Sequence, residues 1–560
     1  MLASRSQIRV VSIAIFAVLV LYIGLQLHGT PAWRSSISNS FPASKPSAVE
    51  EASVKAPVEE PEKIPVHDYS SYNDTDPADE ASRHNANASL EEVSVHNSSA
   101  LANETSSHNT SVSSEEVSVH NSSTPAEDAR VEFWRSFQSL LASSNPDCPP
   151  PKRLDSSGAI GFNPTKAPAR PDLLEMPDGD VEKMRTAHSK LVYKLNTDPP
   201  KMVYTPGTQG IVSTAGGTYL PVLVISLRML RRTGSKLPME VFLADSAEYE
   251  PYICETVLPE LNAKCIVLSD IIDKVPKSVS ITHYQYKVVA MLFSSFEELL
   301  FLDSDAFPIH EPKELFAAEP FASHGLVLWP DYWASTASPL FYNITSQPIP
   351  SMTLRQSSET GEILISKNSH QRSLLLATYY NYYGPDLYYA LLSQGSPGEG
   401  DKETFLAATS VFNESVYQVS ESVRAIGHFQ PDGNLAGSAM VQFDPVEDYR
   451  LTEQGLWRVK NSSVAEAPEH FFVHANFPRF NPATIFGKLD VIRDVNGSFQ
   501  RAWTDTQDTI QAFGSDVERG FWEEITWVAC ELEDKFASWS GRHGLCEHAR
   551  EYSSSVFPSP

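Results

Sequence analysis

The sequence predicts an α/β domain with a mostly parallel central sheet. From about residue 210, short apolar stretches that suit strands alternate with longer amphipathic stretches that suit helices. Strands connected through helices form right-handed crossovers, which place helices on both faces of the sheet. Ligands bind such sheets at the carboxyl ends of the strands, and the run Asp303-Ser304-Asp305 directly follows one of the predicted strands.

Two helices are expected ahead of this alternation. Order begins near Val131, where large apolar residues recur at helical spacing, and a second helix is expected over 176–195. Proline-rich passages at 148–151 and 164–171 separate the first helix from the main fold.

The alternation itself consists of four predicted strands with helices between them. The strands are expected at 211–214, 239–244, 265–268 and 299–302, and the helices over 219–232, through Cys254 and Leu261, and over 284–295. The last strand places the two aspartates at the ligand-binding edge of the sheet.

The composition excludes some classes of partner. The chain has 560 residues, enough for a large core with appended segments, and a formal net charge of −27. Nucleic acid binding requires clustered Lys and Arg, which this acidic balance argues against. A nucleotide is not excluded, because a metal ion neutralises a diphosphate locally.

Five cysteines are few for this length, and none forms a C-x-x-C pair or a Cys/His cluster with zinc spacing. Their grouping permits two short-range disulfides, Cys254–Cys265 and Cys530–Cys546, with Cys148 left over. Burial of some of them as small apolar residues is equally open.

The N-terminus predicts a single membrane anchor followed by a lumenal chain. Residues 10–27 form an uncharged stretch of 18 residues, near the lower limit for a spanning helix. Arg5 and Arg9 precede it, so the positive-inside rule leaves residues 1–9 as a cytosolic tail. A cleaved signal peptide is the alternative, but no clear A-x-A site follows the stretch.

Residues 28–128 are expected to form a disordered, glycosylated stem. They are rich in Ser, Pro, Ala, Asn and Glu, and hold too few large apolar residues to offset the entropy of ordering. Acceptor sequences for N-glycosylation lie in the stem at Asn73, Asn87, Asn97, Asn103, Asn109 and Asn121, and downstream at Asn343, Asn413, Asn461 and Asn496. Beyond the stem we expect an N-terminal extension (129–205), a catalytic domain (206–500) and a C-terminal helical segment (501–560).

Asp303 and Asp305 are candidate metal ligands. They flank one residue immediately after an apolar strand, so a turn of the chain lets both carboxylates converge on one cation. Hard oxygen ligands suit Mg²⁺ or Mn²⁺, and a divalent ion there would bridge the phosphates of a sugar nucleotide. The alternative is a polar turn after a strand, but the preceding alternation of strands and helices favours the functional interpretation.

Long sequence blocks between about Gly210 and Gly427 resemble one known family. The blocks are GIVSTAGG, LRMLRRTGSKLPMEVFLA, HYQYKVVAMLFSSFEELLFLDSDAFP, LVLWPDYW, SSETGEILISK and YYNYYGPDLYYALLSQGSPGEGDKETF. They resemble the fungal Golgi α-mannosyltransferases that build mannan, a family with α-1,2- and α-1,3-transferring members. The block SQGSPGEGDKETF most resembles the α-1,2 branch, whose members add the first branching mannoses to an α-1,6-linked backbone.

The resemblance implies a GT-A fold, GDP-mannose as donor, dependence on Mn²⁺ and retention of the anomeric configuration. It also implies an oligomannose or mannan acceptor, a single-pass type II location in the Golgi membrane, and complexes with other Golgi mannosyltransferases. We therefore expect a retaining α-mannosyltransferase, α-1,2 rather than α-1,3. Ala306 departs from the family pattern, in which Asn is frequent, without removing a ligand.

The resemblance also assigns roles at the metal. Asp303 is expected to face the nucleotide ribose while also ligating the metal, and Asp305 is expected to bind the metal directly. His474 follows a short apolar run and is expected to add a third ligand, since imidazole suits Mn²⁺. A structural role is the alternative for a lone His.

Three residues are candidates for binding the nucleotide. Gly216 and Gly217 close the first strand, where small residues let backbone N–H groups approach a ligand, and an ordinary loop is the alternative. Lys287 is expected either to contact phosphate or to lie solvated on a helix.

Asp401 and Glu403 are the candidate catalytic residues. They lie between a Gly-rich loop and the start of an apolar helix, where a carboxylate also serves as an ordinary helix-start residue. The resemblance places a carboxylate here against the reacting sugar, and no general base is assigned. Asp331 and Glu359 are expected to face the acceptor. Aromatic residues expected beside them, with core packing as the alternative, are Trp329, Trp333, Tyr379, Tyr380, Tyr382, Tyr383, Tyr388 and Tyr389.

Other functions remain open at this stage. A glycosyltransferase with another donor, such as UDP-galactose or UDP-GlcNAc, fits the D-x-D motif, because the motif identifies neither base nor sugar. A glycosylated stem also suits a non-catalytic surface glycoprotein. A glycosidase fits less well, because its paired carboxylates lie apart across a cleft.

Overall fold

The computed structural model describes residues 125–276, 280–430, 435–503 and 506–558. The predicted cytosolic tail (1–9), the anchor (10–27) and nearly all of the stem (28–128) lie outside these residues. Within the described part, no helix combines the length and hydropathy needed to cross a bilayer. All described residues belong to one unit, Pro65–Pro560.

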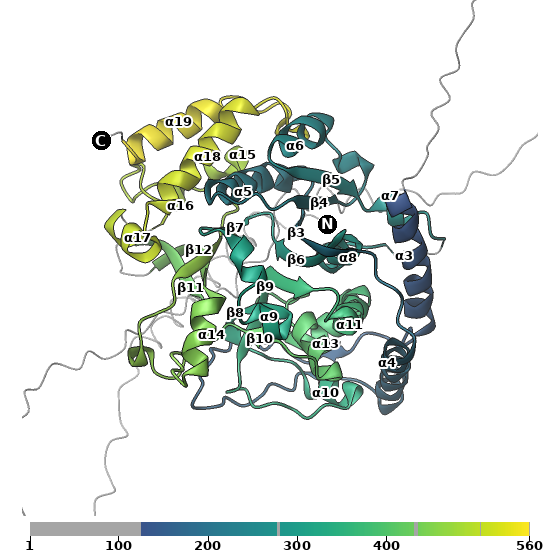
Figure 1. The fold of residues 1–560 in the computed structure, drawn as a ribbon. Helices are drawn as coiled ribbons and strands as arrows, with labels where there is room; N and C mark the ends of the chain where they lie inside the picture. The colour runs from purple at the N-terminus through teal and green to yellow at the C-terminus, as the bar shows by residue number, and fades with distance from the viewer. Residues whose placement is uncertain (1–124, 277–279, 431–434, 504–505, 559–560) are drawn as a thin grey trace, which may run out of the picture. The chain divides into compact units, whose positions relative to one another are not determined.

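The central sheet has seven strands in the order β10-β8-β9-β6-β3-β4-β5 (Figure 1). The four predicted strands are present and run parallel, and the sheet is mostly parallel, as predicted. β9 alone among them is antiparallel to its neighbours β6 and β8. The strands are β3 (Thr205–Thr214), β4 (Met239–Leu243), β5 (Ala263–Val267), β6 (Phe296–Leu302), β8 (Leu326–Ala334), β9 (Gln356–Ser366) and β10 (Tyr417–Gln418).

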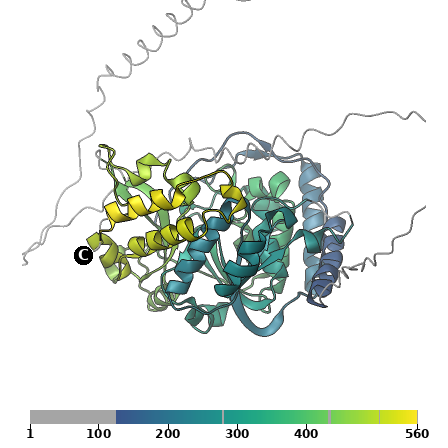
Figure 2. The ribbon, with the colours of Figure 1, turned by 90° about the horizontal axis from the view of Figure 1, so that it is seen from above.

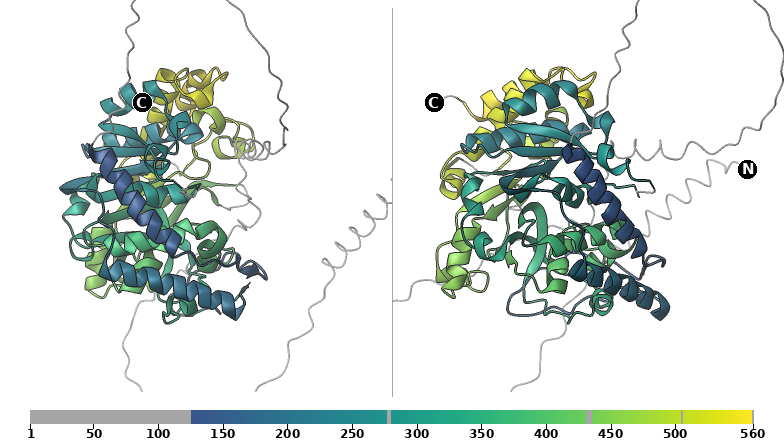
Figure 3. Two further views of the ribbon diagram at one scale, coloured as in Figure 1. Left: turned by 90° about the vertical axis from the view of Figure 1, so that its right-hand side faces the viewer. Right: turned by 45° about the vertical axis from the view of Figure 1, so that its right-hand side comes forward.

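Helices cover both faces of this sheet because apolar side chains alternate along its strands. Ile211 and Leu300 pack in the same cluster as α5 (Leu220–Arg232), whereas Val212 and Phe301 pack in the cluster on the other side. That second cluster contains α3 (Pro125–Ser143), α4 (Asp178–Thr197), α8 (Gln285–Phe293) and α11 (Gln371–Tyr382). The helices predicted near Val131 and over 176–195 are therefore confirmed as α3 and α4, the blue helices of Figure 3.

A second sheet, which the sequence analysis did not predict, joins the first at the D-x-D run. Its four strands are antiparallel in the order β11-β12-β13-β7. They are β11 (Arg424–Phe429), β12 (Leu435–Phe443), β13 (His470–His474) and β7 (Ala306–Pro308). β6 of the first sheet ends at Leu302 and β7 of the second begins at Ala306, so Asp303-Ser304-Asp305 links the two sheets.

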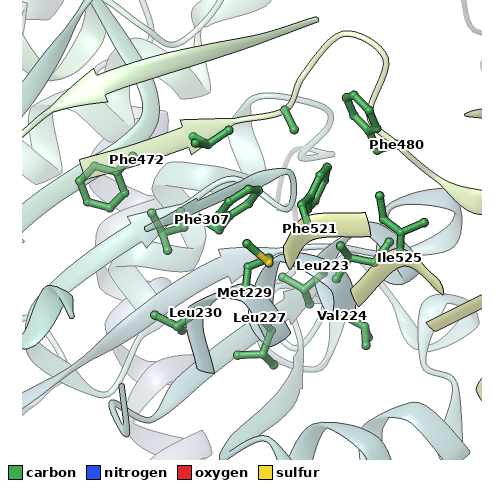
Figure 4. Close-up of a cluster of buried hydrophobic side chains, with 14 of the residues drawn as sticks. Leu223, Val224, Leu227, Met229, Leu230, Phe307, Phe472, Phe480, Phe521 and Ile525 are labelled. Carbon is green, nitrogen blue, oxygen red and sulfur yellow. The ribbon is translucent and has the colours of Figure 1, made fainter. Parts of the chain in front are cut away.

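The C-terminal helices complete the core on the α5 side. α18 (Val517–Glu531) lies along α5 and α19 (Leu545–Val556) lies along α18 (Figure 2). Phe521 and Ile525 of α18 belong to the same apolar cluster as Leu223 of α5, Phe307 of β7 and Phe472 of β13 (Figure 4). The C-terminal segment therefore supports the second sheet, whose β13 carries His474.

The remaining elements are short or peripheral. They are β1 (Lys152–Arg153), β2 (Leu174–Glu175), α6 (Leu258–Glu260), α7 (Ser269–Ile272), α9 (Phe321–His324), α10 (Pro339–Thr345), α12 (Tyr389–Ser393), α13 (Thr404–Phe412), α14 (Pro445–Glu453), α15 (Pro482–Ile485), α16 (Leu489–Ile492) and α17 (Thr506–Phe513). Of the arrangements left open for the cysteines, the structure contains the disulfides Cys254–Cys265 and Cys530–Cys546, with Cys148 free.

Candidate functional site

The site lies where the chain passes from the first sheet to the second. Asp303 follows β6 and donates its backbone N–H to the carbonyl of Gly361 on β9 (2.9 Å). Asp305 precedes β7, whose Ala306 pairs with His474 at the end of β13. The junction of the two sheets therefore brings Asp303 and Asp305 beside a histidine that lies about 170 residues further along the chain.

Asp303, Asp305 and His474 are close enough to share one cation. The Nε2 atom of His474 lies 3.0 Å from Oδ1 of Asp305 and 3.9 Å from Oδ2 of Asp303. One ligand atom from each residue lies within 4.8 Å of the others. Asp305 and His474 are buried and Asp303 is half-buried. Two carboxylates and an imidazole form a donor set that Mn²⁺ accepts, so these residues fit a divalent cation.

The pKa values of these groups reflect the concentration of negative charge. Burial acts to raise the pKa of Asp305, but the charge and hydrogen bond of His474, helped by Arg479, outweigh it and bring the pKa to about 2. Burial acts to lower the pKa of His474, but Asp305 and Glu359 raise it well above its ordinary value. The same negative charge that favours a proton on His474 also favours a divalent cation in its place.

Lys287 lies close to the carboxylates of both Asp303 and Asp401. Its Nζ lies 2.7 Å from Oδ2 of Asp303 and 3.9 Å from Oδ2 of Asp401. Burial acts to lower the pKa of Lys287, but these two carboxylates raise it above its ordinary value; burial also raises the pKa of Asp303. The side chain is only 13% exposed, so the solvated position considered for it is wrong, while its contact with phosphate stays a prediction.

Asp401 carries a buried oxygen that lacks a hydrogen bond. The residue is 3% exposed, and its Oδ2 has no hydrogen-bond donor among the described residues. Burial raises the pKa of Asp401 to about 6. A buried carboxylate oxygen without a donor calls for an explanation such as a bound ligand. This environment suits the sugar-facing role expected for Asp401.

Glu403 has a different environment. Its Oε1 accepts hydrogen bonds from the Ser358 backbone (2.8 Å) and the Ser357 hydroxyl (2.9 Å), and its Oε2 from Arg355 (2.9 Å) and Ser335 (3.0 Å). Burial acts to raise the pKa of Glu403, but Arg355 brings it to about 2. A carboxylate accepts about four hydrogen bonds, so this one is saturated. The catalytic role predicted for Glu403 is untested, and these contacts favour a role in fixing β9 against α13.

The glycine loop after β3 packs closely on the loop after β4. A Cβ at Gly216 would lie 2.1 Å from Oε2 of Glu248, which in turn accepts the backbone N–H of Ala244 (2.8 Å). Gly217 has a φ of 50°, in the left-handed region that favours glycine. Both positions therefore favour glycine, and their contact with a nucleotide stays a prediction.

The two residues expected to face an acceptor lie in different surroundings. Asp331 is buried, and its Oδ2 pairs with Nζ of Lys402 at 2.8 Å. Burial raises the pKa of Asp331, against the opposing charge of Lys402. The Oε1 of Glu359 lies 3.4 Å from Nδ1 of His474. Glu359 therefore belongs to the surroundings of a metal-ligand candidate.

Most of the aromatic residues expected beside the acceptor form the core instead. Tyr379, Tyr380, Tyr388 and Trp329 are fully buried, and the Nε1–H of Trp329 donates to the Phe443 carbonyl (2.9 Å). The acceptor prediction is wrong for these four. Tyr382 and Tyr389 are also buried, Tyr383 is half-buried and hydrogen-bonds the Leu141 carbonyl, and Trp333 is half-buried.

Two residues of the site were missed in the sequence. Arg479 places its Nε 3.5 Å from Oδ2 of Asp305, and its guanidinium lies 5.0 Å from the ring centre of Tyr219, in the glycine loop. Its position five residues after His474 was the available signal. Glu362 is fully buried beside His474, and neither of its oxygens has a hydrogen-bond partner among the described residues. Burial raises the pKa of Glu362 to about 8.

One family model and several curated relatives match the chain. The family model, described as "Mannosyltransferase putative", matches residues 208–354 and 351–444. Alpha-1,2-mannosyltransferase MNN21 of Candida albicans is 36% identical over 64% of this chain and 62% of its own length. MNN23 of the same organism is 30% identical over 59% of this chain and 68% of its own length. MNN2 of Saccharomyces cerevisiae is 32% identical over 55% of this chain and 62% of its own length. The chain thus spans 68% of the length of MNN23 but less than two thirds of the lengths of MNN21 and MNN2.

Likeness to solved structures is distant. The galactosyltransferase LgtC is 13% identical with a TM-score of 0.26, covering 38% of this chain and 73% of that chain. The glycosyltransferase GlyE of Streptococcus pneumoniae is 12% identical with a TM-score of 0.25, covering 38% of this chain and 45% of that chain. Neither score is high enough to inform the fold or the site.

Proposed function

Because the chain belongs to the mannosyltransferase family that these relatives represent, we propose that it transfers mannose from GDP-mannose to an α-mannan or glycoprotein acceptor. The proposed linkage is α-1,2, with retention of the anomeric configuration and a GT-A-like domain. One observation carries the proposal: Asp303, Asp305 and His474 converge on one point in a chain whose relatives are named α-1,2-mannosyltransferases.

In the proposed mechanism, Asp303, Asp305 and His474 hold a divalent cation, for which we propose Mn²⁺. When bound, that ion would supply positive charge that offsets the charge developing on the departing nucleotide. Arg479 lies beside Asp305 and Tyr219 and supplies a second cation to the diphosphate.

In the same proposal, the sugar is bound at Asp401, on the side of Lys287 away from Asp303. The Oδ2 of Asp401, which has no hydrogen-bond partner in the described part of the chain, accepts a hydrogen bond from a sugar hydroxyl. Lys287 balances the charges of the half-buried Asp303 and the buried Asp401, so that both carboxylates face one substrate without repelling it. The loop of Gly216 and Gly217 presents backbone N–H groups to the nucleotide.

The donor is tested by offering the purified full-length chain GDP-mannose, UDP-galactose and UDP-GlcNAc separately, with α-mannobiose and Mn²⁺. A product one mannose longer from GDP-mannose alone is expected. Transfer only from a UDP-sugar would support a glycosyltransferase but contradict the assignment of GDP-mannose as its donor. Methylation analysis of the product should yield 2-linked mannose, whereas 3-linked mannose would make the enzyme an α-1,3-mannosyltransferase.

We also propose a single-pass type II location in the Golgi membrane, with the domain in the lumen and in complex with other Golgi mannosyltransferases. The uncharged stretch 10–27 after Arg5 and Arg9 supports this orientation. The four acceptor asparagines in the described part are all exposed, as glycosylation in the lumen requires: Asn343, Asn413, Asn461 and Asn496. Endoglycosidase treatment of the membrane fraction should increase the gel mobility of the chain; an unglycosylated chain in the soluble fraction would reject the location.

A further inference from the structure

The His474 ring is held from three sides. Its Nε2 lies 3.0 Å from Oδ1 of Asp305, and its Nδ1 lies 3.4 Å from Oε1 of Glu359. Its face lies against the backbone of β9 at Gly361, where an added Cβ would come within 2.5 Å of Nδ1. The side chain is 6% exposed. Its orientation is therefore set by the two carboxylates together with the absence of a side chain at Gly361.

A separate hydrogen bond fixes the side chain of Glu359 independently of His474. Its Oε2 accepts the backbone N–H of Gly361 at 2.5 Å, which leaves Oε1 directed at Nδ1 of His474. The Glu359 side chain is 15% exposed, so water competes little for this oxygen. β9 thus supplies both the carboxylate of Glu359 and, at Gly361, the space that the His474 ring occupies.

The chemistry of imidazole determines which ring nitrogen of His474 would bind a metal and which would keep its proton. A histidine binds a metal through the nitrogen that carries no proton, so the other nitrogen keeps its proton and donates it. With Nε2 turned to Asp303 and Asp305, Nδ1 would keep its proton when a metal is bound. Among the described residues Nδ1 makes no hydrogen bond, but Oε1 of Glu359 lies 3.4 Å away, where a small shift lets it accept that proton. A second cation bound by Glu359, Glu362 and His474 is disfavoured, because His474 would then have to give up both ring protons.

We propose that Glu359 is a positioning residue for His474, which holds the imidazole in the tautomer and orientation that present Nε2 to the cation. This role differs from the acceptor-facing role expected from the sequence, which stays a prediction. It rests on the proposed function only in taking Asp303, Asp305 and His474 as the metal site. Outer carboxylates of this kind change metal affinity by about 10- to 100-fold.

The test is the affinity of the full-length chain for Mn²⁺ itself, followed by the electron paramagnetic resonance signal of the free ion. Glu359→Ala should weaken Mn²⁺ binding about 10- to 100-fold. Glu359→Gln should weaken it less, because the amide oxygen still accepts from Nδ1–H. Glu298→Gln is the matched control: Glu298 is a half-buried carboxylate of β6 that bonds Gln209 (2.8 Å), and it should bind Mn²⁺ like the wild type.

Activity measurements separate positioning from acceptor binding. In Glu359→Gln, the Mn²⁺ concentration for half-maximal activity should rise while the acceptor KM at saturating Mn²⁺ stays unchanged. Wild-type Mn²⁺ affinity in both Glu359 variants, or a raised acceptor KM alone, would overturn the proposal, as would a loss confined to Glu362→Gln. A wild-type chain that transfers mannose without binding Mn²⁺ would also overturn this proposal, but it would leave the proposed mannosyltransferase activity supported. If Glu359→Ala does not fold, the Gln variant decides.

Discussion

The Nζ atom of Lys287 lies 2.7 Å from Oδ2 of Asp303, and the two side chains are 13% and 18% exposed. Lys287 lies between Asp303, a candidate metal ligand, and Asp401, a candidate sugar-binding residue, so one lysine balances two acidic groups. Removing a single partner from a buried pair leaves an uncompensated charge, which costs more than the pair itself contributes.

Lys287→Met should therefore lower the stability of the domain by about 3 kcal/mol and reduce transfer as well. The fall is measured as a lower thermal midpoint. Lys183→Met is the comparison, because Lys183 pairs with Asp180 at the surface (2.9 Å) and is 53% exposed. A surface pair of this kind contributes little to stability, because solvent and salt screen it. Equal midpoints for the two variants would contradict the account of Lys287.

The pH dependence of transfer should report Asp401. Its pKa of about 6 lies above its ordinary value of 3.8 because of burial. Only the ionised carboxylate can accept hydrogen bonds from sugar hydroxyls on both of its oxygens. The rate of transfer should therefore rise between pH 5 and 7 and level off above pH 7. Asp401→Asn should be slower and lack this rise. An unchanged inflection near pH 6 in that variant would show that another group titrates.

The same pKa fixes the sign of the effect on stability. The folded chain holds the proton of Asp401 more tightly than the unfolded chain does. Its contribution to stability is therefore fully present below pH 3.8 and is lost as the pH rises through 6. Asp401→Asn should not lose this contribution, so the difference in thermal midpoint between variant and wild type should move in favour of the variant from pH 4 to pH 7.

Arg479→Gln should weaken donor binding by about 10- to 100-fold, since a hydrogen bond to a charged group is worth about 1.5–3 kcal/mol. The loss should appear in titrations with GDP and be much smaller with guanosine, which has no phosphate. Arg493→Gln is the matched control, because Arg493 also lies over an aromatic ring, that of Phe499 (3.8 Å), outside the site. Equal losses with GDP and guanosine would rule out a diphosphate contact.

Local patterns were sufficient to predict four of the seven strands of the first sheet and the D-x-D run that follows the last of the four. The apolar runs of β3, β4, β5 and β6 are long, and the helices between them are amphipathic, so each element is visible without its neighbours. His474 was predictable in the same way, as a polar residue ending an apolar run.

The second sheet was not predictable because its pairing is non-local. β7 has three residues, Ala306–Pro308, and is a strand only because β13 pairs with it from far along the chain. The role of Glu359 depends on the same pairing, since Nδ1 of His474 reaches it only once β13 is in register. The acceptor prediction for the tyrosines was wrong for another reason. Composition cannot distinguish an exposed aromatic surface from the buried cluster that Tyr379, Tyr380 and Tyr388 form.

The central claim is that Asp305 holds a cation required for mannosyl transfer. The most direct measurement is the initial rate of transfer from GDP-mannose to α-mannobiose by wild type and Asp305→Ala, after chelation and during re-addition of Mn²⁺. We expect the wild type to stop with chelator and recover with Mn²⁺, and the variant to stay about a thousandfold slower at every Mn²⁺ concentration, since the ion supplies several kcal/mol. A variant that matches the wild-type rate, or a wild type indifferent to chelation, would contradict the account.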